Sequence, residues 1–217
     1  MVDSARDPLW ISYPSWLEES CLPGLFAETL GLEAWVLFRK LVELDCERNI
    51  TPDWFSCSHE TLARWTGISL HDLPARLEQL ERGGWIERSA VDEFVENVRI
   101  LTPFPYSIDE AKIRSRLAGR GTSTGRFLLR YLVDPIELNQ VEKVVYLYQM
   151  IFGLRFTPRI AEDLEEIANT YDMGLIYSVF SEAYMKKIKT LAWIRAHLAR
   201  QASDASPPAK SDSETGE

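Results

Sequence analysis

The stretch of residues 56–86 constrains the fold more than any other part of the chain, because its spacing fits two short helices joined by a tight turn. Ser58 can cap a first helix that ends before Gly67, a residue free to adopt the positive φ that a helix end requires. Ser69 can cap a second helix that runs to Arg82. The apolar residues of both segments fall on inward faces, which predicts a helix-turn-helix with one shared core.

The segments that flank this motif complete the pattern of a winged helix. Apolar residues recur with helical spacing over residues 32–48 and predict the first helix of the domain. Residues 85–88 and 94–101 are rich in β-forming residues and predict the hairpin of the wing. We therefore expect a winged-helix domain over residues 24–106. An aromatic arm, residues 1–23, precedes it and is expected to pack on its own domain or on a second subunit.

Composition indicates a globular chain without a membrane segment. The 217 residues are 46% hydrophobic and 26% charged, which suits one large or two small domains. No apolar run approaches the roughly 20 residues that a membrane span needs, and the first residues do not form a signal peptide. We expect a soluble cytoplasmic protein with no membrane partner. Its three cysteines, Cys21, Cys46 and Cys57, are odd in number and scattered, unlike a disulfide framework.

The acidic charge is concentrated in the first half of the chain. Residues 1–106 carry 9 Lys and Arg against 18 Asp and Glu, within a net charge of −9 for the whole chain. Phosphate neutralisation supplies most nucleic-acid affinity, so an acidic winged helix binds DNA poorly unless its basic residues gather on one face. If residues 70–82 read a duplex groove, the contacts would come from His71, Arg76, Gln79 and Arg82. The other interpretation is a structural or oligomerising module without a DNA role of its own.

A basic stretch separates the first domain from the rest of the chain. Residues 107–133 begin with a capping signal for a short helix and then contain a glycine-rich break at residues 119–125. The basic residues of this linker are Lys112, Arg114, Arg116, Arg120, Arg126 and Arg130. Phosphate is the natural counterpart of such a stretch. The alternative is a solvated linker whose arginines pair with the acidic first domain.

The remaining sequence predicts a multi-helix domain over residues 134–201. Start signals at Asp134-Pro135 and Thr157-Pro158 open two helices, and two more follow, the last over residues 191–201. Residues 202–217 are acidic and rich in Ser and Pro, so we expect them to form a disordered tail.

Part of this region resembles a known family. The matching residues are Tyr146 or Tyr148 ahead of Phe152-Gly153, then Arg155, then Thr157-Pro158 at the start of a helix, then Leu175, Ile176, Val179 and Phe180 in the following helix. The segment resembles the C-terminal domain of DnaD-like primosomal proteins, a family that also has a winged helix before its helical domain. In the last helix, Trp193, His197 and Gln201 differ from the family's Tyr-x-x-x-Ile-x-x-x-Trp pattern.

The resemblance implies a role in the initiation or restart of DNA replication, with an N-terminal domain that self-associates and a C-terminal domain that binds DNA. The partners it implies are single- or double-stranded DNA, replication initiation or helicase-loading proteins, and further copies of the chain. Phosphate contacts and base stacking in the C-terminal region would come from Lys186, Lys187, Lys189, Trp193, Arg195 and Arg200. A core tryptophan beside solvated lysines is the alternative for this group.

Catalysis finds little support in the residues. His59, His71 and His197 are isolated in sequence, and the cysteines lack the close pairs of a zinc site. We therefore expect a mostly α-helical, two-domain primosome component that is not an enzyme and needs no cofactor or metal. The alternatives are a winged-helix transcription regulator that reads duplex DNA with residues 70–82, and a scaffold that binds only proteins.

Overall fold

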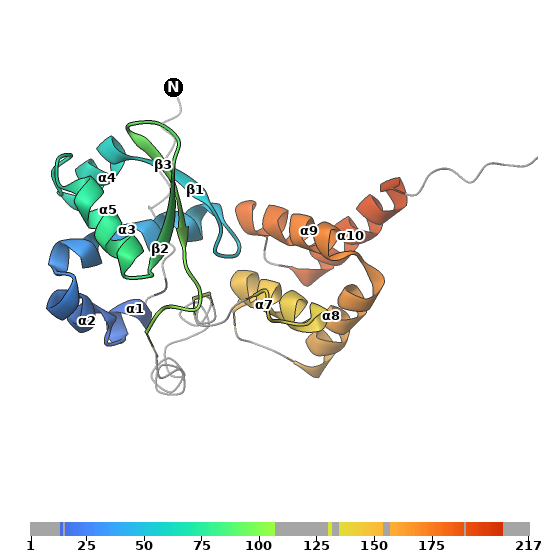
Figure 1. The fold of residues 1–217 in the computed structure, drawn as a ribbon. Helices are drawn as coiled ribbons and strands as arrows, with labels where there is room; N and C mark the ends of the chain where they lie inside the picture. Colours follow the sequence, from blue (N-terminus) through green and yellow to red (C-terminus); the bar gives the residue numbers. More distant parts are fainter. Residues whose placement is uncertain are drawn as a thin grey trace, which may run out of the picture.

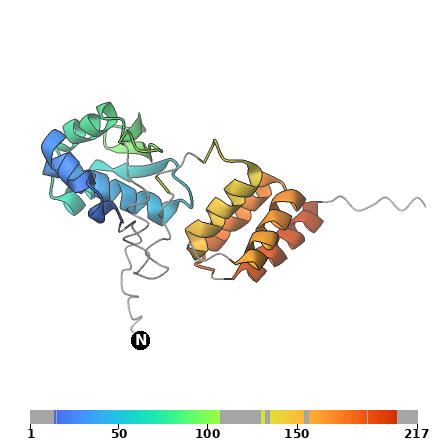
Figure 2. The same cartoon turned by 90° about the horizontal axis from the view of Figure 1, so that it is seen from below.

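The computed structural model describes residues 14, 16–106, 130–131, 135–153, 157–188 and 190–205, with the backbone alone for residues 16, 19 and 205. The fold is mostly α-helical with one small antiparallel sheet, as the sequence predicts (Figure 1). The winged-helix unit contains α1 (Trp16–Glu19), α2 (Leu22–Thr29), α3 (Leu32–Arg48), β1 (Phe55–Ser58), α4 (His59–Thr66), α5 (Leu73–Arg82), β2 (Ile86–Ala90) and β3 (Val95–Ile100). The helical unit contains α7 (Gln140–Phe152), α8 (Pro158–Thr170), α9 (Met173–Met185) and α10 (Leu191–Ala205). Figure 2 shows the same two bodies from below.

The winged-helix unit contains the wing hairpin that the sequence predicts, together with a third strand. Its sheet has the order β1-β3-β2, with both pairings antiparallel, and β2 and β3 form the wing hairpin. The core behind the sheet is aromatic. Phe38 of α3 lies at its centre, with ring-centroid distances of 5.1 Å to Phe26, 5.3 Å to Trp85 and 5.5 Å to Phe104. Edge-on and offset ring contacts of this kind add to the stability gained from burial alone.

Local sequence signals place α3 and α4 correctly. The helix expected over residues 32–48 is α3, which has these bounds. Ser58 caps α4 by accepting a hydrogen bond from the Thr61 N–H at 3.2 Å, and Gly67 ends α4 with φ of +76°. The aromatic arm expected to end at residue 23 is helical from residue 16, and its Leu17 and Leu22 are fully buried in the unit's own core.

The second helix of the motif begins later than expected. Ser69 does not cap α5. Instead, Ser69 accepts a hydrogen bond from the Asp72 N–H at 3.1 Å within a separate turn, and α5 begins at Leu73. Pro74 explains the difference, because proline has no N–H and fits only the first turn of a helix. The helix that would start at Ser69 would place Pro74 further inside.

The helical unit confirms one start signal and corrects another. Thr157 caps α8 by accepting from the Ile160 N–H, as predicted. The signal at Asp134-Pro135 does not start a helix. The α7 helix begins at Gln140, because Asn139 and Glu142 form a reciprocal capping box. The α10 helix continues to Ala205, beyond the expected start of the disordered tail at residue 202. No helix of the described residues is long and apolar enough to cross a membrane.

Candidate functional site

The α5 helix, which would read DNA in a winged helix, is occupied by contacts within its own fold. Arg76 Nε lies 2.8 Å from Glu33 Oε2 at the start of α3, and Arg76 Nη1 donates to Gln79 Oε1 at 3.2 Å. Gln79 Nε2 donates to the Leu30 carbonyl at 3.0 Å. Two of the four side chains expected to enter a groove therefore join α5 to the end of α2 and the start of α3.

The exposed face of α5 carries more acid than base. Arg82 is exposed but forms an ion pair with Glu78 one turn earlier. Glu81 is also exposed and lies 3.6 Å from Arg88 of the wing. His71 is exposed in the turn before α5. A phosphate backbone approaching this face would meet two carboxylates beside one paired guanidinium, an arrangement that weakens the electrostatic part of DNA binding.

The arginines of the wing are also paired. Arg88 Nε donates to Glu96 Oε2 and Nη2 to Oε1, both at 2.6 Å, and His59 Nε2 lies 2.9 Å from the same carboxylate. Burial alone would raise the pKa of Glu96, but the hydrogen bonds and charge of Arg88 and His59 outweigh it, so this pKa lies below its ordinary value. Arg99 forms an ion pair with Glu87 on the neighbouring strand. Arg88 and Arg99 therefore form ion pairs within the wing and are not free to contact phosphate.

In the helical unit, two of the expected DNA contacts are in ion pairs. Lys186 Nζ lies 2.5 Å from Glu182 Oε1, and this hydrogen bond is the main cause of the lowered pKa of the Glu182 carboxyl. Arg195 bridges Asp163 and Glu166 of α8, with a distance of 2.9 Å to the latter. These cations are partly neutralised before any ligand approaches.

Three neighbouring side chains of α10 contact one another in the same C-terminal region. Trp193 stacks on His197, with ring centroids 4.4 Å apart and an angle of 14° between the planes. Arg200 Nη2 lies 2.8 Å from His197 Nδ1. Trp193 is partly buried against the core, which agrees with the alternative of a packing role. Lys187 is exposed, and Lys189 lies outside the described residues.

Arg130 has a different place from the one expected. Its side chain is fully buried, so it does not face DNA. Arg130 Nη2 forms an ion pair with Asp45 Oδ2 at 3.0 Å and also donates to the carbonyls of Asp45 (3.0 Å) and Asn49 (2.8 Å). Arg130 Nη1 donates to the Ile50 carbonyl at 2.6 Å. The guanidinium therefore binds carbonyl oxygens at the end of α3 and in the loop after it, at the negative end of the helix dipole.

The buried carboxylate of Asp45 is matched by further donors. The Tyr131 hydroxyl donates to Asp45 Oδ2 at 2.7 Å, and Asn49 Nδ2 donates to Oδ1 at 2.9 Å. Because the single hydroxyl proton of Tyr131 goes to Asp45, the Cys46 thiol at 3.4 Å from that oxygen is the donor of their contact. Burial raises the pKa of the Cys46 thiol to about 11, so it stays protonated at neutral pH.

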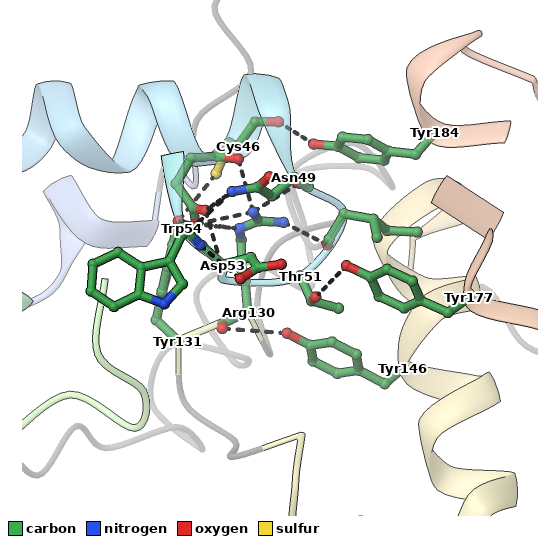
Figure 3. Close-up of polar contacts among 12 residues, drawn as sticks. Cys46, Asn49, Thr51, Asp53, Trp54, Arg130, Tyr131, Tyr146, Tyr177 and Tyr184 are labelled. Carbon is green, nitrogen blue, oxygen red and sulfur yellow. Dashed lines mark hydrogen bonds and ion pairs between the residues drawn. The ribbon is translucent and has the colours of Figure 1, made fainter. Parts of the chain in front are cut away.

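Three tyrosines of the helical unit reach this cluster, which Figure 3 shows in detail. The contacts are Tyr184 hydroxyl to Cys46 carbonyl, Tyr146 hydroxyl to Arg130 carbonyl at 3.3 Å, and Tyr177 hydroxyl to Thr51 hydroxyl at 3.2 Å. Each tyrosine comes from α7 or α9, and each partner belongs to the end of α3, to the loop after it or to the 130–131 segment. The end of α3 is therefore where the two units are hydrogen-bonded to each other.

The basic stretch begins and ends at one point of the winged-helix unit. The Phe104 N–H donates to the Tyr131 carbonyl at 3.2 Å, and the two rings stack with centroids 5.1 Å apart and planes 9° apart. Residues 104 and 131, which flank most of the predicted linker, are therefore in contact with each other. Its remaining basic residues lie outside the described part of the chain: Lys112, Arg114, Arg116, Arg120 and Arg126.

Within the described residues, no group of three or more His, Cys, Asp and Glu side chains is placed to hold a metal ion. Comparisons of the chain with protein-family models, with curated proteins and with solved structures found no match.

Proposed function

We propose that this chain is a DNA-binding protein of replication initiation or restart, in which the winged-helix unit makes protein contacts and basic residues beyond Pro105 contact DNA. The observation that carries the proposal is that the polar side chains of α5 are already engaged within the fold. Its polar side chains Arg76 and Gln79 are bonded within the fold, and its exposed surface is acidic. A winged helix in this condition is better suited to assembly than to groove reading.

Exposed apolar side chains support protein contact by the winged-helix unit. Most of the large exposed hydrophobic residues of the described chain belong to this unit, including Leu32, Trp65, Leu70, Val91 and Phe94. Single exposed apolar residues are common on any protein, but such a concentration on one unit favours an interface with further copies of the chain or with replication proteins.

The sequence places the cations for DNA in the stretch that begins and ends at the stacked pair of Phe104 and Tyr131. Residues 107–129 carry five Lys and Arg against two Asp and Glu. Both ends of this stretch are fixed on the winged-helix unit. Any DNA bound there would therefore be held beside the unit that makes the protein contacts, which is the arrangement that a nucleoprotein assembly needs. The basic group of residues 186–200 would add to this binding.

The test compares charge variants of the intact chain. A triple variant, Arg114→Gln with Arg116→Gln and Arg120→Gln, is compared with a matched variant, His71→Ala with Arg82→Gln, on the exposed face of α5. Fluorescence anisotropy with labelled single- and double-stranded DNA is measured at several salt concentrations. The triple variant should lose at least tenfold in affinity and show a smaller salt slope, because each lost phosphate contact lowers the slope by roughly 0.7–0.9.

The comparison has two results that would contradict the proposal. Loss of binding in the α5 variant alone would indicate a regulator that reads duplex DNA. Absence of binding by the unmodified chain to either DNA would indicate a scaffold that binds only proteins. Size-exclusion chromatography with light scattering tests the assembly part separately, and Trp65→Ser should lower the oligomer mass if that exposed residue lies in the interface.

A further inference from the structure

Lys187 has a backbone conformation that lysine disfavours. It follows the end of α9 and has φ of +55°. The Lys187 N–H donates to the Tyr184 carbonyl at 3.1 Å, and the Ile188 N–H donates to the Ala183 carbonyl at 2.9 Å. This pair of bonds is a Schellman motif, in which the left-handed position is most often glycine because a Cβ atom is strained there.

Elsewhere the chain uses glycine for this purpose. Gly67 ends α4 with φ of +76°, and Gly84 follows α5 with φ of +74° and the same pair of bonds, from its own N–H to the Glu81 carbonyl and from the Trp85 N–H to the Leu80 carbonyl. Among the described residues, Lys187 is the single residue other than glycine with a positive φ. The positive φ at a helix end is thus occupied by glycine in the winged-helix unit and by lysine after α9, and the lysine adds a positive charge.

Contacts within the fold do not account for the lysine. Its side chain is exposed, and no hydrogen bond or ion pair of its Nζ atom occurs among the described residues. A cation near the end of a helix interacts favourably with the helix dipole, but the preceding Lys186 already supplies one, fixed by its ion pair with Glu182. Neither the backbone nor the packing explains a lysine at this position.

We infer that Lys187 of the helical unit contacts a DNA phosphate. Its side chain would provide this contact, although glycine would fit the backbone of this helix end with less strain. The inference rests on the proposed function and selects one residue of the C-terminal basic group. Residues held in rarely populated backbone regions cluster at binding sites, where the surrounding structure maintains them. The other cations of the group described by the structure are engaged: Lys186, Arg195 and Arg200 have partners on α8, α9 or α10.

The test uses the intact chain with Lys187→Gly, because this change should alter stability and binding in opposite directions. Glycine relieves the positive φ, so the Tm should rise by about 2–4 °C. Affinity for a labelled oligonucleotide should fall by about 5- to 10-fold near 0.1 M salt, and the slope of log K against log salt should decrease by about 0.7–0.9. Lys187→Arg should keep the wild-type affinity and slope.

Arg159→Gln is the matched control, since Arg159 is also exposed in the helical unit, has no ion pair among the described residues and lies in regular helix. The inference is overturned if Lys187→Gly binds like the unmodified chain, if Arg159→Gln loses as much affinity and slope, or if Lys187→Gly lowers the Tm. In these three cases DNA binding by the unmodified chain still stands. Absence of any binding by the unmodified chain would overturn both the inference and the proposed function.

Discussion

Removal of the Arg130 guanidinium should strongly destabilise the protein. Arg130→Met keeps a long apolar side chain but leaves the Asp45 carboxylate buried without its cation, and leaves the carbonyls of Asn49 and Ile50 without donors. Breaking one side of a buried ion pair costs about 3–5 kcal/mol of unfolding free energy. The Tyr131 hydroxyl and the Asn49 amide still donate to Asp45, which keeps the expected loss within this range.

Urea unfolding followed by circular dichroism measures this loss, and a thermal scan should show a Tm lower by about 6–20 °C. The control is Arg82→Met, which removes an exposed arginine from its pair with Glu78 and should cost at most about 1 kcal/mol. Arg130→Lys should also destabilise, because an ammonium cannot reproduce the fork that reaches three carbonyls and a carboxylate.

A double-mutant cycle with Asp45→Leu separates the two sources of the loss. If the unpaired charge dominates, Arg130→Met combined with Asp45→Leu should recover much of the stability that either single change removes. A loss below about 1 kcal/mol for Arg130→Met alone would refute the reasoning, since it would mean that the pair contributes no more than an exposed one.

Four further outcomes follow from the described contacts. Tyr184→Phe should cost about 0.5–1.5 kcal/mol and broaden the distance distribution between spin labels on the two units, whereas Tyr171→Phe, whose hydroxyl has no described partner, should do neither. Ellman titration of the native protein should detect Cys21 alone, because the other two cysteines are buried with raised pKa values, and all three after denaturation. The lowered pKa of Glu96 contributes stability that is present above its ordinary value of about 4.3 and is lost as pH falls through the lower folded-state pKa, so Glu96→Gln should flatten the acid limb of the stability curve. A fragment that ends at residue 106 should have a lower urea midpoint than one that ends at residue 131, because only the longer fragment retains Arg130; equal midpoints would contradict this role.

Short-range patterns in the sequence predicted most of the fold. The bounds of α3, the cap at Ser58, the glycine end at Gly67 and the start at Thr157 depend on residues within one or two turns of each other, so their signals are local. The two wrong helix starts were also decided locally. The capping box of Asn139 is visible in the sequence and outranks the Asp134-Pro135 signal, because its two side chains accept hydrogen bonds from two of the N–H groups left unpaired at the start of the helix.

The cluster around Arg130 could not be placed from the sequence, because its members lie far apart in the chain. Arg130 belongs by position to a basic stretch, and charge patterning alone assigns such residues to phosphate or solvent. Two signals pointed elsewhere. Arg130 stands within the apolar run Phe127-Leu-Leu-Arg-Tyr-Leu-Val133, and Asp45 falls on the inward stripe of the helix at residues 32–48, four residues after Leu41.

Arg130 and Asp45 each stand among apolar residues. If both are buried, each needs an oppositely charged partner, because an unpaired buried charge is too costly to retain. Neither pattern identifies the partner residue, because the sequence contains many other acids with which Arg130 could pair. Only the folded structure identifies the pair: Tyr131 stacks on Phe104, and the neighbouring Arg130 then lies at the end of α3 beside Asp45. The boundary predicted after residue 106 therefore separates Asp45 from Arg130, which form an ion pair in the folded chain, so DNA-binding tests on this protein require the intact chain.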